Sequence, residues 1–156
     1  MLALFVLVPL AGLVLLSLPF PALRRGFSLY VTAGLFAAQA VFIGSSSAFV
    51  APDGPAFLEQ LQFGFAADAF TRLVLFSIGL VGFAAALVAC QKLTDERRQH
   101  SLASLMLVAL IGMNGTASVT DFFSLYVFLE VAAIASFILI VLEHGLFAVE
   151  GAFRYL

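Results

Sequence analysis

Long apolar stretches alternate with short polar connections along the whole chain. Five stretches are long and apolar enough to cross a membrane, which takes about 20 apolar residues for about 30 Å of hydrocarbon. They cover residues 2–20, 27–49, 66–90, 101–119 and 122–142. A sixth apolar stretch begins near residue 146 and is too short to cross. The pattern predicts an all-α, polytopic membrane helix bundle over residues 1–156. This single membrane domain has five complete transmembrane helices and the start of a sixth.

The polar connections predict how the helices are oriented. Two arginines follow the first predicted helix and three basic residues follow the third, whereas the connection between the second and third has none. Basic residues in short loops favour the cytoplasmic side of a membrane. We therefore expect an integral protein of a bacterial inner membrane with its N-terminus outside. The run DERRQH (95–100) is interpreted as a solvated cytoplasmic turn.

The composition excludes a soluble protein. The chain is 63% hydrophobic and 10% charged, whereas soluble domains are about 45–50% apolar and about 25% charged. A net charge of −2 offers no attraction to nucleic acid. His100 and His144 are isolated, and no phosphate-binding loop or catalytic triad is present. We expect no catalytic residue, metal or cofactor in this chain, and the lipid bilayer as its surroundings.

One carboxylate, Glu130, interrupts the fifth apolar stretch. It lies eight residues into the predicted helix, about 12 Å along its axis at 1.5 Å per residue and near the membrane midplane. A charge there costs about 2.5–3.5 kcal/mol on insertion scales. Glu130 is either protonated and hydrogen-bonded to a neighbouring helix or a proton-relay carboxylate. The relay is favoured, because Tyr126 one turn away could hydrogen-bond to it and Ala133 leaves room for water or a partner side chain.

Other charged residues are possible supporting groups. Asp68 and Arg72 are four residues apart with the acid first, the favourable order for a helix ion pair. They form either a structural pair near the membrane surface or part of an outer polar path. Glu150 and Arg154 have the same spacing in the sixth stretch and either mark a solvated boundary or form a pair inside an apolar segment. Asp121 is expected to cap the fifth helix.

Small residues spaced along the predicted helices indicate where neighbouring helices approach closely. Such residues lie on the third, fourth and fifth predicted helices. They include Gly79, Gly82, Ala86, Gly112, Thr116, Ala132 and Ser136. Small side chains separated by one turn allow membrane helices to pack with their backbones close together. We interpret them as packing residues without chemistry of their own.

The sequence from 105 to 140, LMLVALIGMNGTASVTDFFSLYVFLEVAAIASFILI, resembles a known membrane family. It is similar to the fourth and fifth helices of the antiporter-like subunits of respiratory complex I, whose relatives occur in multisubunit sodium/proton antiporters and membrane-bound hydrogenases. The family pattern is matched by Gly112, Met113, Asp121, Glu130 and Ser136. FAADAFTRLVLF (65–76) and AVEGAFRYL (148–156) resemble the flanking family helices, with Arg154 where many members have Lys. The resemblance leans toward the N-type subunits of complex I or the D-type subunits of the antiporters.

The resemblance implies a role for Glu130 and a setting for the chain. In the family, the matching glutamate pairs with a lysine two helices later, and their coupling is thought to drive proton transfer. This sequence ends before such a lysine, so we expect the N-terminal third of a translocating subunit. The implied function is transport of protons, or of sodium, within a redox-driven pump such as NADH-quinone oxidoreductase. The implied partners are the other membrane subunits of that complex.

Three alternatives remain open on the sequence alone. The chain could be a small accessory or assembly protein that packs against larger membrane subunits, in which case Glu130→Gln would leave pumping intact. It could be a subunit of a multisubunit sodium/proton antiporter. It could also be a self-standing carrier built from oligomers of five helices, which predicts transport by the purified chain in reconstituted vesicles.

Overall fold

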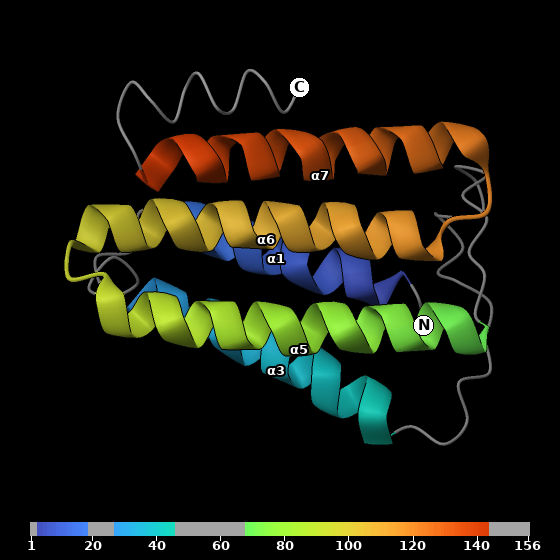
Figure 1. Cartoon of the computed structure of the whole chain (residues 1–156), viewed down its shortest axis with the longest axis horizontal. Helices are drawn as coiled ribbons and strands as arrows, with labels where there is room; N and C mark the ends of the chain where they lie inside the picture. The colour runs from blue at the N-terminus through green and yellow to red at the C-terminus, as the bar shows by residue number, and fades with distance from the viewer. Residues whose placement is uncertain (1–2, 19–26, 46–67, 144–156) are drawn as a thin grey trace.

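The described residues of the chain form an antiparallel array of five helices. The computed structural model describes residues 3–18, 27–45 and 68–143. Its helices are α1 (Leu4–Ser17), α3 (Phe27–Ser45), α5 (Ala69–Lys92), α6 (Glu96–Ser118) and α7 (Phe122–Glu143). Successive helices run in opposite directions, and α3 is inclined to α5, α6 and α7 (Figure 1). The prediction of an all-α membrane helix bundle is confirmed.

Four of the five helices are long and apolar enough to cross a membrane, and α1 is shorter. Its 14 residues extend about 21 Å at 1.5 Å per residue, compared with about 30 Å of hydrocarbon. It ends at Ser17 because Leu18 is extended, with φ −70° and ψ 141°. Leu18 precedes Pro19, and a proline ring disfavours the helical conformation in the residue before it. The predicted helix over 2–20 therefore ends earlier, and the predicted sixth helix lies outside the described residues.

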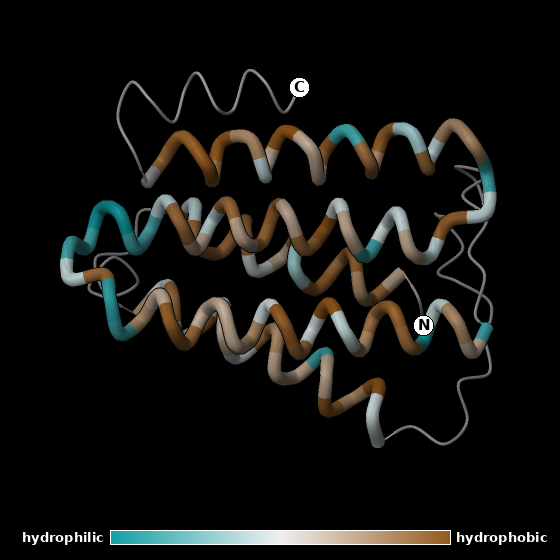
Figure 2. Tube along the Cα trace, viewed as in Figure 1, coloured by the Kyte–Doolittle hydropathy of each residue, from teal (hydrophilic) through white to brown (hydrophobic). Residues whose placement is uncertain are grey.

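The connection between α5 and α6 is shorter than the sequence suggested. The interpretation of residues 95–100 as a turn was wrong, because α6 already begins at Glu96, but residues 95–98 are exposed, as a solvated segment requires. Asp95 is its N-cap, and its Oδ1 accepts a hydrogen bond from the backbone N–H of Arg97 at 3.1 Å. Hydropathy marks the start of the apolar stretch, whereas the cap marks the start of the helix. The first turn of α6 is therefore polar and exposed. Figure 2 shows hydrophilic residues gathered at this connection, with hydrophobic residues predominating along the helices.

Helix α6 is the centre of the array. It packs against α1, α3, α5 and α7, whereas the main neighbour of α7 is α6. Half of the apolar stretch of α6 is buried, compared with 6% for α7. The main apolar cluster joins α1, α3 and α6 and consists of Leu16, Leu29, Phe36, Ala103, Leu107 and Leu110. Helix α7 therefore lies on the outside of the described bundle.

Two glycines of α6 allow α7 to approach closely. A Cβ atom on Gly112 would lie 2.6 Å from the backbone N of Ala132, and a Cβ atom on Gly115 would overlap the ring of Phe128. At Gly112 the obstacle is the backbone of α7, so a larger side chain requires a shift of α7, whereas at Gly115 the ring of Phe128 would have to move. The packing role predicted for Gly112 and Ala132 is confirmed. The two contacts also set the register of the antiparallel pair, in which Asn114 lies at about the level of Glu130.

Candidate functional site

Glu130 is the ninth residue of the 22-residue helix α7 and is exposed. It shares the outward face of α7 with Phe123 and Tyr126, whose exposed fractions are 77% and 65%. The other charged residues and histidines of the described segments lie outside the helices or within five residues of a helix end. Glu130 is therefore the one ionisable carboxylate that the described helices carry near their middle.

The described part of the chain offers Glu130 no partner. No hydrogen bond or ion pair joins it to a residue in these segments, and Tyr126 likewise has none. The expected hydrogen bond from Tyr126 is thus not formed, although both side chains lie on the same face of α7. The carboxylate points away from α6 and the rest of the bundle. Whatever satisfies Glu130 in a membrane approaches this outer face.

A second polar feature, missed from the sequence, lies inside the bundle. Gln39 of α3 and Asn114 of α6 hydrogen-bond reciprocally, with Gln39 Nε2 donating to Asn114 Oδ1 at 3.0 Å and Asn114 Nδ2 donating to Gln39 Oε1 at 2.7 Å. Gln39 Nε2 also donates to the carbonyl of Leu75 on α5 at 2.9 Å. Asn114 Nδ2 also donates to the carbonyl of Phe5 on α1 at 2.8 Å. This amide pair joins four helices through buried hydrogen bonds.

The bond to α1 follows from a proline. In a regular helix the carbonyl of Phe5 accepts from the backbone N–H of residue 9, but Pro9 has no N–H. Membrane helices tolerate proline where neighbouring groups satisfy the carbonyl that it leaves. Asn114 supplies a donor to that carbonyl. Pro9 on α1 and Asn114 on α6, far apart in the sequence, therefore form one structural unit.

The amide pair and Glu130 lie at a similar level of the bundle and face different ways. Asn114 has no exposed surface and Gln39 is 6% exposed, whereas Glu130 is on the outer face of α7. The pair therefore does not act as the partner of Glu130. The sequence could have indicated this pair, because it shows two amide side chains within apolar helices. Nothing in the sequence showed that they face each other.

Asp68 and Arg72 do not form the predicted ion pair. Asp68 precedes α5 and caps it, with Oδ1 accepting from the backbone N–H of Thr71 at 2.7 Å. This hydrogen bond stabilises the carboxylate and lowers the pKa of Asp68 below its usual range. Arg72 instead donates from Nε and Nη2 to the carbonyl of Ile43, at 3.2 and 3.0 Å. Ile43 is in the last turn of α3, where carbonyls lack helical partners and the helix dipole favours a cation.

The remaining candidate residues are Asp121, Glu150 and Arg154. Asp121 precedes α7, and its Oδ1 accepts from the backbone N–H of Ser124 at 2.7 Å. The predicted N-cap is therefore confirmed. Glu150 and Arg154 lie outside the described residues. Within the described ranges, no group of three or more His, Cys, Asp or Glu side chains gathers as a metal site would require.

Two curated proteins are similar to this chain, and both are named as the D-type subunit of a Na(+)/H(+) antiporter. The protein from Alkalihalophilus pseudofirmus is 33% identical over 98 residues, which cover 62% of this chain and 20% of the relative. The protein from Bacillus subtilis is 29% identical over 91 residues, which cover 58% of this chain and 18% of the relative. Both matches support the resemblance of this chain to the antiporter-like membrane subunits.

The resemblance to antiporter-like subunits that the sequence indicates is therefore confirmed by both relatives. The chain spans about a fifth of the length of each of these two relatives. No protein-family model matches it. The names of both relatives refer to a sodium/proton antiporter, and neither refers to a redox enzyme.

Proposed function

We propose that this chain is part of the ion-translocating membrane subunit of a multisubunit sodium/proton antiporter, with Glu130 as a proton-relay carboxylate. The observation that supports the proposal most directly is the position of Glu130, near the middle of α7 and on its outward face. The names of the relatives favour an antiporter over a redox-driven pump such as NADH-quinone oxidoreductase. The other membrane subunits of the complex are the proposed partners.

The chemistry of an intramembrane carboxylate supports a relay. Its charged form costs about 2.5–3.5 kcal/mol in the middle of a membrane on insertion scales, and its protonated form costs less. Water or a nearby cation favours the charged form, so a change in either one makes the group release or take up a proton. Because Glu130 faces outward from α7, a further membrane segment that carries a cation can reach it directly. A lysine on a later helix, which the family resemblance implies, would be such a cation.

The rest of the described bundle acts as a rigid support for this group. Gly112 and Gly115 hold α7 against α6, and the amide pair ties α6 to three more helices. The amides are neutral and do not titrate. Proton uptake by Glu130 therefore leaves the charge of the support unchanged.

The test is Glu130→Gln in the complete complex, assayed in everted membrane vesicles with a pH-sensitive dye. An amide cannot release and take up a proton, so we expect sodium-dependent proton movement to be abolished. Glu130→Asp keeps the titrating group on a shorter side chain and should retain part of the activity. Assembly of each variant is followed by native gel electrophoresis.

Glu96→Gln is the matched control, because it makes the same chemical change at an exposed position in the first turn of α6. It should transport like the wild type. Normal transport by an assembled Glu130→Gln complex would instead support an accessory role for this chain.

A second measurement distinguishes an antiporter from a redox-driven pump. Respiratory electron transfer is measured in the same vesicles. In an antiporter, Glu130→Gln stops ion exchange and leaves the electron-transfer rate unchanged. In a redox-driven pump, it also lowers coupled electron transfer, because the two processes share one mechanism.

A further inference from the structure

A groove runs over α6 between α5 and α7. Both helices pack on α6 and have no extensive interface with each other among the described helices. Two adjoining cavities, of about 410 and 260 Å³, share Ala85 of α5 and Leu139 of α7 as lining residues. Met106 and Ala109 of α6 line the larger cavity. The groove is therefore an apolar channel, open on one side, with α6 as its floor.

The groove follows one face of α5. Its lining residues on this helix follow one another at spacings of one or three residues, from Ser77 through Ala85 to Lys92, as expected for a single helical face. Fifteen residues separate Ser77 from Lys92, which corresponds to about 22 Å at 1.5 Å per residue. One half of a hydrocarbon core of about 30 Å is about 15 Å. The groove can therefore hold an acyl chain from the membrane surface to the bilayer centre.

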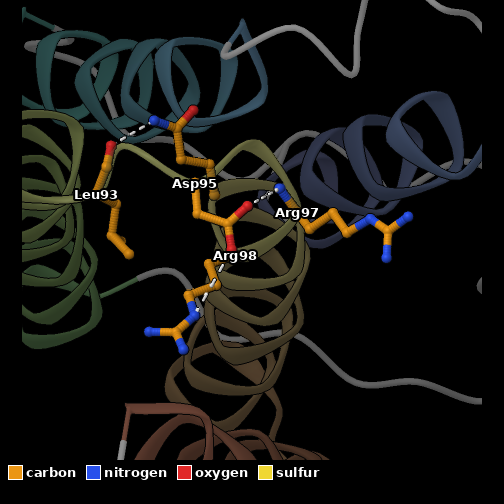
Figure 3. A network of polar contacts seen from close by, with 5 residues as sticks. Leu93, Asp95, Arg97 and Arg98 are labelled. Atoms are coloured by element: carbon orange, nitrogen blue, oxygen red, sulfur yellow. Dashed lines mark hydrogen bonds and ion pairs between the residues drawn. The ribbon is translucent and has the colours of Figure 1, made fainter.

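Two cations line the end of the groove at the α5–α6 connection. They are Lys92 and Arg98. Lys92 has no hydrogen bond or ion pair to a described residue. Arg98 has an ion pair with Asp95 at 3.7 Å between two largely exposed side chains, which is weak. Figure 3 shows Arg98 pointing toward the space between α5 and α7, whereas Arg97 points to the other side, toward α1.

We propose that this groove is a binding site for one anionic phospholipid. An acyl chain lies along α5 over Met106 and Ala109, and the phosphate binds to Lys92 and Arg98. Basic pockets between transmembrane helices are suited to anionic lipid headgroups. The apolar lining alone would accept any lipid tail, so the two cations select the headgroup. The site is separate from Glu130 and does not depend on the transport proposal.

The test is native mass spectrometry of the complete purified complex after delipidation and addition of phosphatidylglycerol or phosphatidylethanolamine with identical acyl chains. We expect one tightly retained phosphatidylglycerol at this site and no equally retained phosphatidylethanolamine. Lys92→Gln combined with Arg98→Gln should weaken phosphatidylglycerol retention about tenfold or more, because each cation near the membrane surface contributes to anion binding. Arg97→Gln is the matched control and should bind like the wild type.

Two further variants test the apolar part of the groove. Ala85→Trp should fill it and reduce phosphatidylglycerol retention, whereas Ala84→Trp, at the exposed neighbouring position, should not. If Ala85→Trp does not assemble, Ala85→Leu replaces it. Equal retention of both lipids, or unchanged retention in the Lys92/Arg98 variant, would mean ordinary surrounding lipid and would overturn the proposal. A cross-link from Val88→Cys to another membrane helix would also overturn it, by showing that protein fills the groove.

Discussion

The amide pair and Glu130 lie at a similar level of the bundle and are satisfied in opposite ways. All four amide N–H groups of Gln39 and Asn114 donate hydrogen bonds inside the described bundle. Glu130 is exposed and has no partner in the described segments. Neutral amides both donate and accept, so neighbouring backbone carbonyls and a second amide suffice. An ionised carboxylate only accepts, and the helix carbonyls around it cannot help.

Under the proposed function, the amide pair is a structural support and Glu130 is the group that carries out proton transfer. A satisfied neutral pair contributes a fixed arrangement of helices, and it gains nothing from a change in protonation. An unsatisfied carboxylate contributes little to the described bundle and responds to whatever approaches it. Substitution of Gln39 or Asn114 should therefore affect stability more than transport, whereas substitution of Glu130 should affect transport more than stability.

The largest effect on stability is expected at the close contact between α6 and α7, which fixes the position of α7 along α6. Gly112→Ala adds a Cβ atom 2.6 Å from the backbone N of Ala132, which forces α7 away from α6 and displaces Glu130. Overpacking of this kind costs about 1–3 kcal/mol, and we expect the upper part of that range because the obstacle is backbone. The measurement is unfolding of the purified protein in mixed micelles, with transport measured in parallel.

Gly34→Ala is the control for that substitution. A Cβ atom on Gly34 of α3 would have nothing within 4 Å. The variant should be as stable as the wild type or slightly more stable, since alanine favours helix more than glycine does. Equal stability of the two alanine variants would contradict the close approach of α6 and α7.

Asn114→Leu should come next in size. It removes the donor to the carbonyl of Phe5 and leaves the Gln39 amide buried without its partner. Interhelical hydrogen bonds in membranes contribute about 0.6 to 1.7 kcal/mol each, so a loss of about 2 kcal/mol is expected in the same unfolding measurement. Glu130→Gln should change stability by less than about 0.5 kcal/mol, as for a surface position. A larger loss of stability in Glu130→Gln than in Asn114→Leu would contradict the structural role of the amide pair.

A double-mutant cycle sharpens the result. Gln39→Leu combined with Asn114→Leu removes both amides together, so no amide remains buried and unpaired. The combined loss should be smaller than the sum of the two single losses, because much of each single loss comes from the partner left behind. Strict additivity would mean that the two amides do not act as a pair.

A smaller effect is expected where α5 meets the end of α3. Arg72→Gln removes the cation that donates twice to the carbonyl of Ile43. A cation at a helix C-terminus contributes about 0.3–1 kcal/mol at the surface and up to about 2 kcal/mol when partly buried, and we expect about 1 kcal/mol in mixed-micelle unfolding. Arg72→Lys should recover part of the loss. A variant that loses transport but not stability would favour the original hypothesis of an outer polar path.

The smallest effect concerns pH and the cap of α5. The hydrogen bond from Thr71 lowers the pKa of Asp68 in the folded protein. The ionised cap therefore stabilises the folded protein fully at a pH above the pKa that Asp68 has in the unfolded chain. This stabilisation is lost as the pH falls through the lower pKa that Asp68 has in the folded protein. Asp68→Asn keeps a capping side chain without a titrating group. The difference in unfolding midpoint between wild type and Asp68→Asn should therefore shrink as the pH approaches that range, and a constant difference would contradict the cap.

The sequence was most informative where one residue and its immediate neighbours decide the outcome. Asp121 was expected to cap α7 and does so, and a small residue at Gly112 indicated close packing that is present. Local reasoning failed when two local signals competed. The favourable i, i+4 spacing suggested an Asp68–Arg72 pair. Instead, Asp68 caps the start of α5, and Arg72 hydrogen-bonds to the carbonyl of Ile43 at the end of α3.

The sequence by itself determined that the chain is a bundle of apolar helices and that Glu130 lies near the middle of one. Both follow from hydropathy and from the fixed rise of a helix, which are local properties. Only the tertiary structure decided which way each polar residue faces. The packing of α6 turned Asn114 inward toward Gln39 and the carbonyl left by Pro9, and the position of α7 turned Glu130 outward. These directions depend on contacts between segments far apart in the chain, because a helix has no preferred face until its neighbours cover one.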